Sequence, residues 1–266
     1  MIPLSTVEIA AATGGTTDVA IKVTGIATDS RKVGPGDLFV ALPGTRVDGG
    51  EFVDAALAAG AAAALVPRAS AGTRRVHVDD PLVALGRIAA LVRQRSAARV
   101  VGITGSTGKT STKDVLRALL EPHVSVVASR ENQNNELGVP LTLCRAAADT
   151  EVVVAEMAMR GLGQIAYLAE IALPDVAVIT SVGPVHLELL GTVERVAQAK
   201  AEILHHMAPG GVAVVPAGEP LLRPHMAQHA GQVVGLAPER TPMCGLLRSA
   251  ERTAEARRRS RSTVER

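Results

Sequence analysis

A glycine-rich turn between a strand and a helix constrains the fold of this chain more than any other feature. Residues 102–113 read Gly-Ile-Thr-Gly-Ser-Thr-Gly-Lys-Thr-Ser-Thr-Lys and directly follow the apolar pair Val100-Val101. Such a turn can wrap backbone N–H groups around a phosphate, and the start of the following helix adds a favourable dipole. The pattern therefore predicts a nucleoside-triphosphate site on an α/β domain.

Seven residues of this turn form the predicted ATP-binding set: Gly105, Ser106, Thr107, Gly108, Lys109, Thr110 and Ser111. Lys109 can supply a positive charge for the outer phosphates, and the hydroxyl of Thr110 is placed to bind Mg²⁺. The usual phosphate-loop pattern needs a glycine where Ile103 stands, so the glycines are shifted here. The shift sets the turn apart from that of ordinary kinases and GTPases. A glycine-rich turn that serves packing alone is the alternative interpretation.

Strand and helix patterns alternate from Arg99 onward. The expected strands are mostly continuous apolar runs, which is typical of strands covered on both faces; they span residues 100–104, 152–155, 176–180 and 212–215. The expected helices span residues 111–120, 138–145, 164–171 and 193–207. This alternation predicts an α/β fold with a doubly wound parallel sheet, whose ligands lie at the carboxyl ends of the strands.

The chain divides into segments of different character. Residues 1–80 are expected to form a small N-terminal α/β domain, with strands at 22–27, 38–41 and 61–66 and a helix at 52–59. The other expected segments are a linker helix within 81–98, a central ATP-binding domain at 99–217, a remainder at 218–247 with one possible strand at 233–236, and a tail at 248–266. The tail has seven Arg and almost no apolar residues, so it is predicted to be disordered.

Composition excludes several classes of protein. The formal net charge is +2, but the tail holds seven Arg and three Glu, which leaves 21 basic and 23 acidic residues in the body. A nucleic-acid-binding domain needs a basic face, and aromatic stacking platforms are scarce because the chain has no Trp, one Tyr and two Phe. Two cysteines make no disulfide scaffold. Neither a leader pattern nor a membrane-spanning apolar run is seen, so we expect a cytoplasmic protein without membrane insertion.

Four further features are candidates for chemistry, and two of them follow expected strands. Glu156 follows a strand on the edge that carries the glycine-rich turn, where a carboxylate could hold Mg²⁺; an ordinary surface glutamate is the alternative. His186 follows the next strand and is either a metal or phosphate contact or a structural histidine. The Asn-rich segment 132–140 could hold an anionic substrate or simply cap a helix. Lys200 lies within an expected helix and would ordinarily be solvated, but the chain has only five lysines.

Together these residues resemble the Mur ligase family, the ATP-dependent amide ligases of peptidoglycan precursor synthesis. The similarity covers about residues 20–215, and its motifs lie at Thr104–Thr110, Asn134–Pro140, Glu156–Gly161, Gly183–Glu188, Ala199–Glu202, Thr28–Arg31 and Leu38–Asp48. Within the family, the motifs are most similar to those of the members that join D-alanyl-D-alanine to UDP-N-acetylmuramoyl-tripeptide.

The resemblance implies a mechanism and roles for particular residues. ATP phosphorylates a carboxylate to an acyl phosphate, and the amine of D-alanyl-D-alanine attacks it. Lys109, His186 and Lys200 would be catalytic. Thr110 and Glu156 would hold one Mg²⁺, and His186 a second, with Lys200 carbamylated by CO₂ to become a metal-binding carboxylate. The substrate-binding residues implied by the resemblance are Ser30, Arg31, Asn134, Asn135 and Arg160. A monomer is expected.

The sequence also departs from the family pattern. Ala158 stands where Gly is usual, Gly50 where His is common, and Ser181 and Pro216 where Asn is expected, which bears on contacts to adenine and ribose. The family has a third, C-terminal domain, which would need on the order of 100 residues. Fewer residues than that follow residue 215, where the similarity ends, so we expect a truncated or frame-shifted member. The alternatives are an inactive remnant that binds only ATP and UDP-sugar, and a small-molecule kinase on a P-loop fold.

Overall fold

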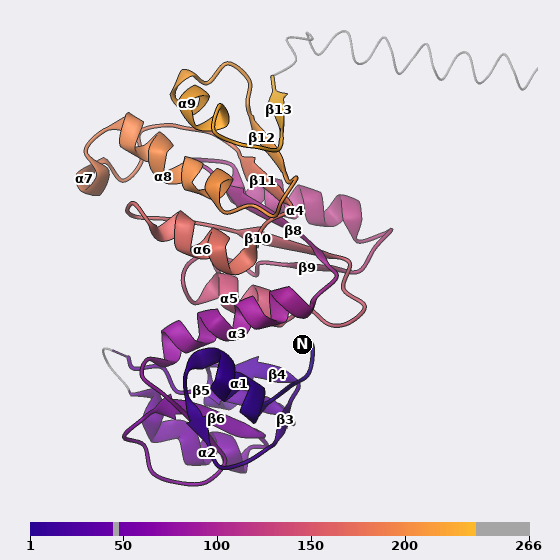
Figure 1. Cartoon of the computed structure of the whole chain (residues 1–266), viewed down its shortest axis with the longest axis vertical. Helices are drawn as coiled ribbons and strands as arrows, with labels where there is room; N and C mark the ends of the chain where they lie inside the picture. Colours follow the sequence, from indigo (N-terminus) through magenta and orange to yellow (C-terminus); the bar gives the residue numbers. More distant parts are fainter. Residues whose placement is uncertain (45–47, 238–266) are drawn as a thin grey trace, which may run out of the picture. The chain divides into compact units, whose positions relative to one another are not determined.

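The computed structural model describes residues 1–44 and 48–237, which contain two larger sheets and a two-stranded sheet (Figure 1). The N-terminal sheet has five strands in the order β2-β7-β6-β5-β4. Its strands are β2 (Thr16–Thr17), β4 (Gly25–Ala27), β5 (Asp37–Val40), β6 (Ala63–Pro67) and β7 (Arg75–Val78). Strands β4 to β7 are parallel to their neighbours, and β2 is antiparallel to β7.

Two short helices pack against this first sheet: α1 (Thr6–Thr13) contacts β2 and β7, and α2 (Val53–Ala58) contacts β5 and β6. The turns η1 (Ser30–Lys32) and η2 (Gly49–Phe52) contact α2. Helix α1 begins at a capping box, in which Ser5 and Glu8 satisfy each other's backbone N–H groups. The strand predicted over residues 22–27 is divided: β3 (Lys22–Val23) pairs with β1 (Leu4–Ser5), whereas β4 pairs with β5. The single strand expected at 22–27 is therefore two strands, each in a different sheet.

Helix α3 (Pro81–Arg95) follows β7 and is capped by Asp80, whose carboxylate accepts from the N–H groups of Leu82 and Val83. It packs against α1 on one side and against α5 (Gly138–Cys144) and α6 (Gln164–Ala172) on the other. The segment expected to be a linker helix is thus a helix, and one face of it is buried against these neighbours.

The second sheet has six strands in the order β13-β12-β11-β8-β10-β9. Their bounds are β8 (Arg99–Thr104), β9 (Val126–Ala128), β10 (Val152–Glu156), β11 (Val176–Ile179), β12 (Val212–Pro216) and β13 (Gln232–Leu236). The five strands from β12 to β9 are all parallel to their neighbours. The remaining helices are α4 (Lys109–Leu120), α7 (Leu187–Leu190), α8 (Val193–His205), η3 (Pro220–Leu222) and α9 (Arg223–Met226). The predicted α/β class is confirmed.

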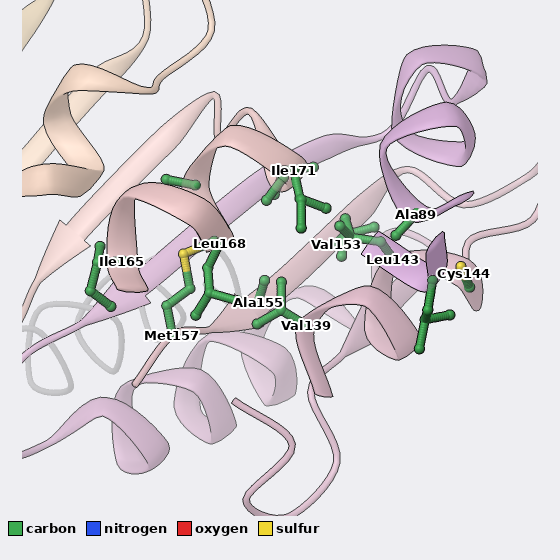
Figure 2. Close-up of a cluster of buried hydrophobic side chains, with 14 of the residues drawn as sticks. Ala89, Val139, Leu143, Cys144, Val153, Ala155, Met157, Ile165, Leu168 and Ile171 are labelled. Carbon is green, nitrogen blue, oxygen red and sulfur yellow. The ribbon is translucent and has the colours of Figure 1, made fainter. Parts of the chain in front are cut away.

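Both faces of this sheet are covered, which explains its continuous apolar strands. Ile103, Val154 and Val178 are buried on the face where Leu116 of α4 packs. The alternate residues of β10, Val153 and Ala155, belong to the larger core on the opposite face, which α5 and α6 supply with apolar side chains (Figure 2).

Several local expectations need correction. Helix α4 begins at Lys109 rather than at residue 111, β10 includes Glu156, and α8 ends at His205 rather than at residue 207. Strands β7 and β9 and helix α1 were not expected, because runs of three to eight residues carry too little periodicity. The predicted disordered tail at 248–266 lies outside the described residues. In the described ranges, no helix is both long and apolar enough to cross a membrane.

Candidate functional site

The glycine-rich turn follows β8 directly and opens α4. Gly105 has φ +151° and Gly108 has φ +82°, and both angles strongly favour glycine. A Cβ on Gly105 would lie 1.9 Å from Oγ1 of Thr180, at the end of β11. The two glycines therefore allow the turn to pass close to the neighbouring strand end.

Hydrogen bonds from the segment after β11 hold the turn in place. The hydroxyl of Thr180 donates to the carbonyl of Thr107 at 2.5 Å, and the N–H of Thr107 donates to Oγ of Ser181 at 2.9 Å. Ser106 and Gly183 exchange two further bonds, at 3.1 and 2.9 Å. The side chains of Ser106 and Thr107, predicted to contact phosphate, thus contact the 180–183 segment here.

The remaining residues of the turn stay open to a ligand. Nζ of Lys109 donates to the carbonyl of Gly105 at 2.8 Å, so the ammonium folds back over the turn. Thr110 and Ser111 are exposed in the first turn of α4. An anion can be held here by backbone N–H groups, the helix dipole and one lysine.

Glu156 is the last residue of β10 and is 2% exposed. Its Oε1 accepts from Nδ2 of Asn134 at 2.9 Å, and its backbone N–H donates to Oγ of Ser129 at 3.0 Å. Its Oε2 is buried without a hydrogen-bond partner, and so is Oγ1 of Thr104 at the end of β8. Buried carboxylate and hydroxyl oxygens without partners are costly, which makes them suited to bind a cation.

Mg²⁺ fits this donor set, because it prefers carboxylate oxygens together with water and phosphate oxygens. The described ranges contain no group of three or more His, Cys, Asp or Glu side chains placed to share a metal ion. That finding is compatible with a hard cation bound through the carboxylate of Glu156, the hydroxyl of Thr104 or Thr110, and a nucleotide. Asn134 contributes by orienting the carboxylate of Glu156.

Lys200 lies in α8 and is 3% exposed. Burial, together with the smaller effect of the charge of Lys109, lowers the pKa of its ammonium to about 8. The two amines are therefore close enough to repel each other. A lowered pKa leaves a larger neutral fraction near pH 7, which is the form that reacts as a nucleophile.

His186 is placed differently from the other predicted ligands. It begins the short helix α7 with φ +54°, an unusual angle for a residue other than glycine. Its Nδ1 lies 3.8 Å from Oε1 of Glu188, and its side chain is 43% exposed. The described structure gives it a partner in its own helix rather than in Glu156.

The two predicted residues of the Asn-rich segment, Asn134 and Asn135, make different contacts. Oδ1 of Asn135 accepts from the N–H of Gly138 at 3.0 Å, so this side chain caps α5, whereas Asn134 contacts Glu156. The backbone N–H of Arg160 donates to Oε1 of Gln164 at 2.6 Å, and its side chain is exposed. A substrate role for these three residues stays a prediction.

Ser30 and Arg31 lie in a separate pocket of about 530 Å³ in the N-terminal sheet region. Residues after β4, together with Phe39, Leu42 and Phe52, line this pocket. Arg31 pairs with Asp29 at 2.8 Å, and its side chain is 86% exposed. The lining of this pocket includes no residue of the glycine-rich turn.

Sequence reasoning missed several residues of this region. Ser129 and Thr180 were not assigned as contributors, because isolated hydroxyls after a strand carry no local signal. Thr104 and Ser181 were named only as parts of the family pattern, without the contacts that the structure gives them. Lys113 was also missed; it is 3% exposed and lies one helical turn after Lys109. The scarcity of lysine in the chain was the signal that could have indicated it.

Comparison with known proteins assigns the family. The chain matches the descriptions "Mur ligase family, catalytic domain" over residues 22–98 and "Mur ligase middle domain" over residues 103–242, the second of which covers more than half of its 266 residues. This chain belongs to the Mur ligase family.

Individual relatives agree with that assignment. The chain is 44% identical over 199 residues to the UDP-N-acetylmuramoyl-tripeptide--D-alanyl-D-alanine ligase of Synechocystis sp., which is 73% of this chain and 44% of the relative. MurF from Acinetobacter baumannii superposes with a TM-score of 0.79 at 33% identity, covering 88% of this chain and 53% of that one. MurF ligase from Thermotoga maritima, solved in complex with ADP, gives 0.74 at 37% identity, covering 82% and 51%. This chain spans about half the length of the relatives it matches.

Proposed function

We propose that this protein is an ATP-dependent amide ligase of peptidoglycan precursor synthesis in the cytoplasm, which joins D-alanyl-D-alanine to UDP-N-acetylmuramoyl-tripeptide. The observation that carries the proposal is the buried Oε2 of Glu156, which has no hydrogen-bond partner and lies at the same sheet edge as the glycine-rich turn. The names of the relatives support the choice of substrates, and the ADP bound to the Thermotoga maritima protein supports the choice of nucleotide.

The proposed reaction has two steps. A carboxylate oxygen of the tripeptide attacks the γ-phosphorus of ATP, the bond to the β-phosphate oxygen breaks, and ADP leaves. The nitrogen of D-alanyl-D-alanine then attacks the acyl carbon, phosphate leaves with its bonding electron pair, and the amine loses a proton. Lys109 would turn from the Gly105 carbonyl to the phosphoryl oxygens and stabilise the charge that develops there.

Thr110 and Glu156 would hold Mg²⁺, which when bound neutralises charge on the phosphoryl oxygens. Asn134 would keep the carboxylate of Glu156 directed toward this site. His186 and Lys200 would serve a second ion, and Ser30 with Arg31 would contact the uridine diphosphate in the separate pocket. Asn135 and Arg160 would face the substrate.

Carbamylation of Lys200 is the least ordinary part of the proposal. Reaction of its neutral amine with CO₂ would replace a buried cation beside Lys109 with an anion, so a repulsion would become an attraction. Lys200→Ala is expected to lose activity and to recover part of it with added formate. Full activity of Lys200→Ala without a carboxylate would refute this role.

The function itself is tested by its product. Purified protein is incubated with Mg-ATP, UDP-N-acetylmuramoyl-tripeptide and isotopically labelled D-alanyl-D-alanine, and the mixture is analysed by mass spectrometry. The proposal predicts a labelled amide, absent with Lys109→Met. A phosphorylated hydroxyl compound formed without the amine would instead indicate a kinase.

A further inference from the structure

A cavity of about 490 Å³ lies along β9 and has no assigned role. Its lining includes Arg117 of α4, Arg130 after β9 and Arg145 after α5, and it contains no residue of the 105–111 turn. Two acids, Asp37 and Glu121, also line it. Three guanidinium groups at one cavity make it distinct from both the phosphate turn and the pocket of Ser30.

The acids offset only part of the charge of this arginine cluster. Glu121 pairs with Arg117 at 2.8 Å, whereas Asp37, whose Oδ2 accepts from the N–H of Gly34 at 2.8 Å, forms no ion pair with an arginine among the described residues. Within residues 1–44 and 48–237, no ion pair involves Arg130 or Arg145. Two guanidinium charges therefore face the cavity without a carboxylate partner in the described part of the chain.

Arg145 lacks one hydrogen bond and lies near two other positive charges. Its Nη2 donates to the carbonyl of Ala128, but its Nε is buried without a partner. Burial lowers the pKa of its guanidinium to about 10, and the charges of Arg130 and Arg117 contribute in the same direction. A bound anion would relieve both the unmade hydrogen bond and the repulsion between the arginines.

The backbone of β9, beside the arginine cluster, has polar groups that can also bind a ligand. Strand β9 is at the edge of the six-stranded sheet, so one side of its backbone has no strand partner in the described structure. Planar guanidinium groups match phosphate oxygens in a bidentate manner, and several of them together suit a dianion better than a monoanion. We propose that this cavity binds a small phosphorylated ligand through the guanidinium groups of Arg130 and Arg145, with Arg117 at its margin.

The test uses inorganic pyrophosphate as the probe, measured by isothermal titration calorimetry on the whole chain. All proteins carry Lys109→Met, to weaken binding at the phosphate turn. In this background we expect pyrophosphate to bind at this cavity, with an affinity weakened about tenfold or more by Arg130→Met and by Arg145→Met. Arg99→Met, an exposed arginine at the start of β8 outside the cavity, is the matched control and should leave the affinity unchanged.

Arg130 is exposed, so its variant keeps the test valid even if Arg145→Met fails to fold. Absence of pyrophosphate binding in the Lys109→Met protein, or equal affinity in the Arg130→Met and Arg99→Met proteins, would overturn the proposal. Tighter binding of succinate than of pyrophosphate would overturn the assignment to a phosphorylated ligand. Because the readout is binding, it is independent of ligase activity.

Discussion

Lys200 offers the sharpest test of the site's electrostatics. In carbon-dioxide-free buffer, Lys200→Met removes a buried ammonium and keeps most of the side chain's length. The pKa of this ammonium falls from 10.5 to about 8. Since each pKa unit is worth about 1.4 kcal/mol, the charged form costs the fold at most about 3.5 kcal/mol. We therefore expect Lys200→Met to raise the free energy of unfolding at pH 7 by about 1–3 kcal/mol.

The difference in unfolding free energy between Lys200→Met and the wild type should decrease as pH rises. Below pH 8 both folded and unfolded states carry the proton, so the full cost is present. Between pH 8 and 10.5 the folded state releases the proton while the unfolded state keeps it, so the wild-type protein gains stability relative to the variant as pH rises. The cost falls below about 1 kcal/mol by pH 10.

Urea unfolding followed by circular dichroism, at pH 7 and at pH 10, measures both quantities. Lys22→Met removes an exposed lysine of β3 and serves as the matched control, with an expected change within about 0.5 kcal/mol. A Lys200→Met protein no more stable than wild type at pH 7, or a difference that stays constant up to pH 10, would refute the reasoning.

Three further predictions concern the phosphate turn and its neighbours. Gly105→Ala should cost at least about 2 kcal/mol of stability in thermal melts, because its Cβ would meet Thr180 at 1.9 Å, whereas Gly161→Ala, with nothing within 4 Å, should cost less than about 0.5 kcal/mol. Glu156→Gln should weaken Mg-ATP binding in calorimetry about tenfold and leave metal-free ATP binding unchanged; an equal loss in both would contradict a metal role. Thr180→Val should destabilise the protein by about 1 kcal/mol in urea, through its bond to the turn, and unchanged stability would argue against that contribution.

The central sheet was the most predictable part of the fold. Its strands β8, β10, β11 and β12 are apolar runs long enough to be recognised, and the glycine-rich turn fixed the order of strand, turn and helix. Strand β9 has three residues and is defined by its pairing with β10, which no local pattern indicates. The division of residues 22–27 between two sheets likewise depends on long-range pairing.

The candidate site was predictable in its residue types and less so in its contacts. Glu156 was expected as an edge carboxylate, but its burial and its bond to Asn134 follow from packing around β10. Asn135 looked equivalent to Asn134, yet it caps α5 because it lies three residues before Gly138. The hydroxyl of Thr180 acts across 73 residues of sequence, which explains why sequence reasoning missed it.

The most direct test of the proposed function is phosphate release by the purified protein. The complete mixture contains Mg-ATP, UDP-N-acetylmuramoyl-tripeptide and D-alanyl-D-alanine, and each component is left out in turn. The proposal predicts release that requires all three. Bound ATP without release in the complete mixture, or release that persists without D-alanyl-D-alanine, would contradict it.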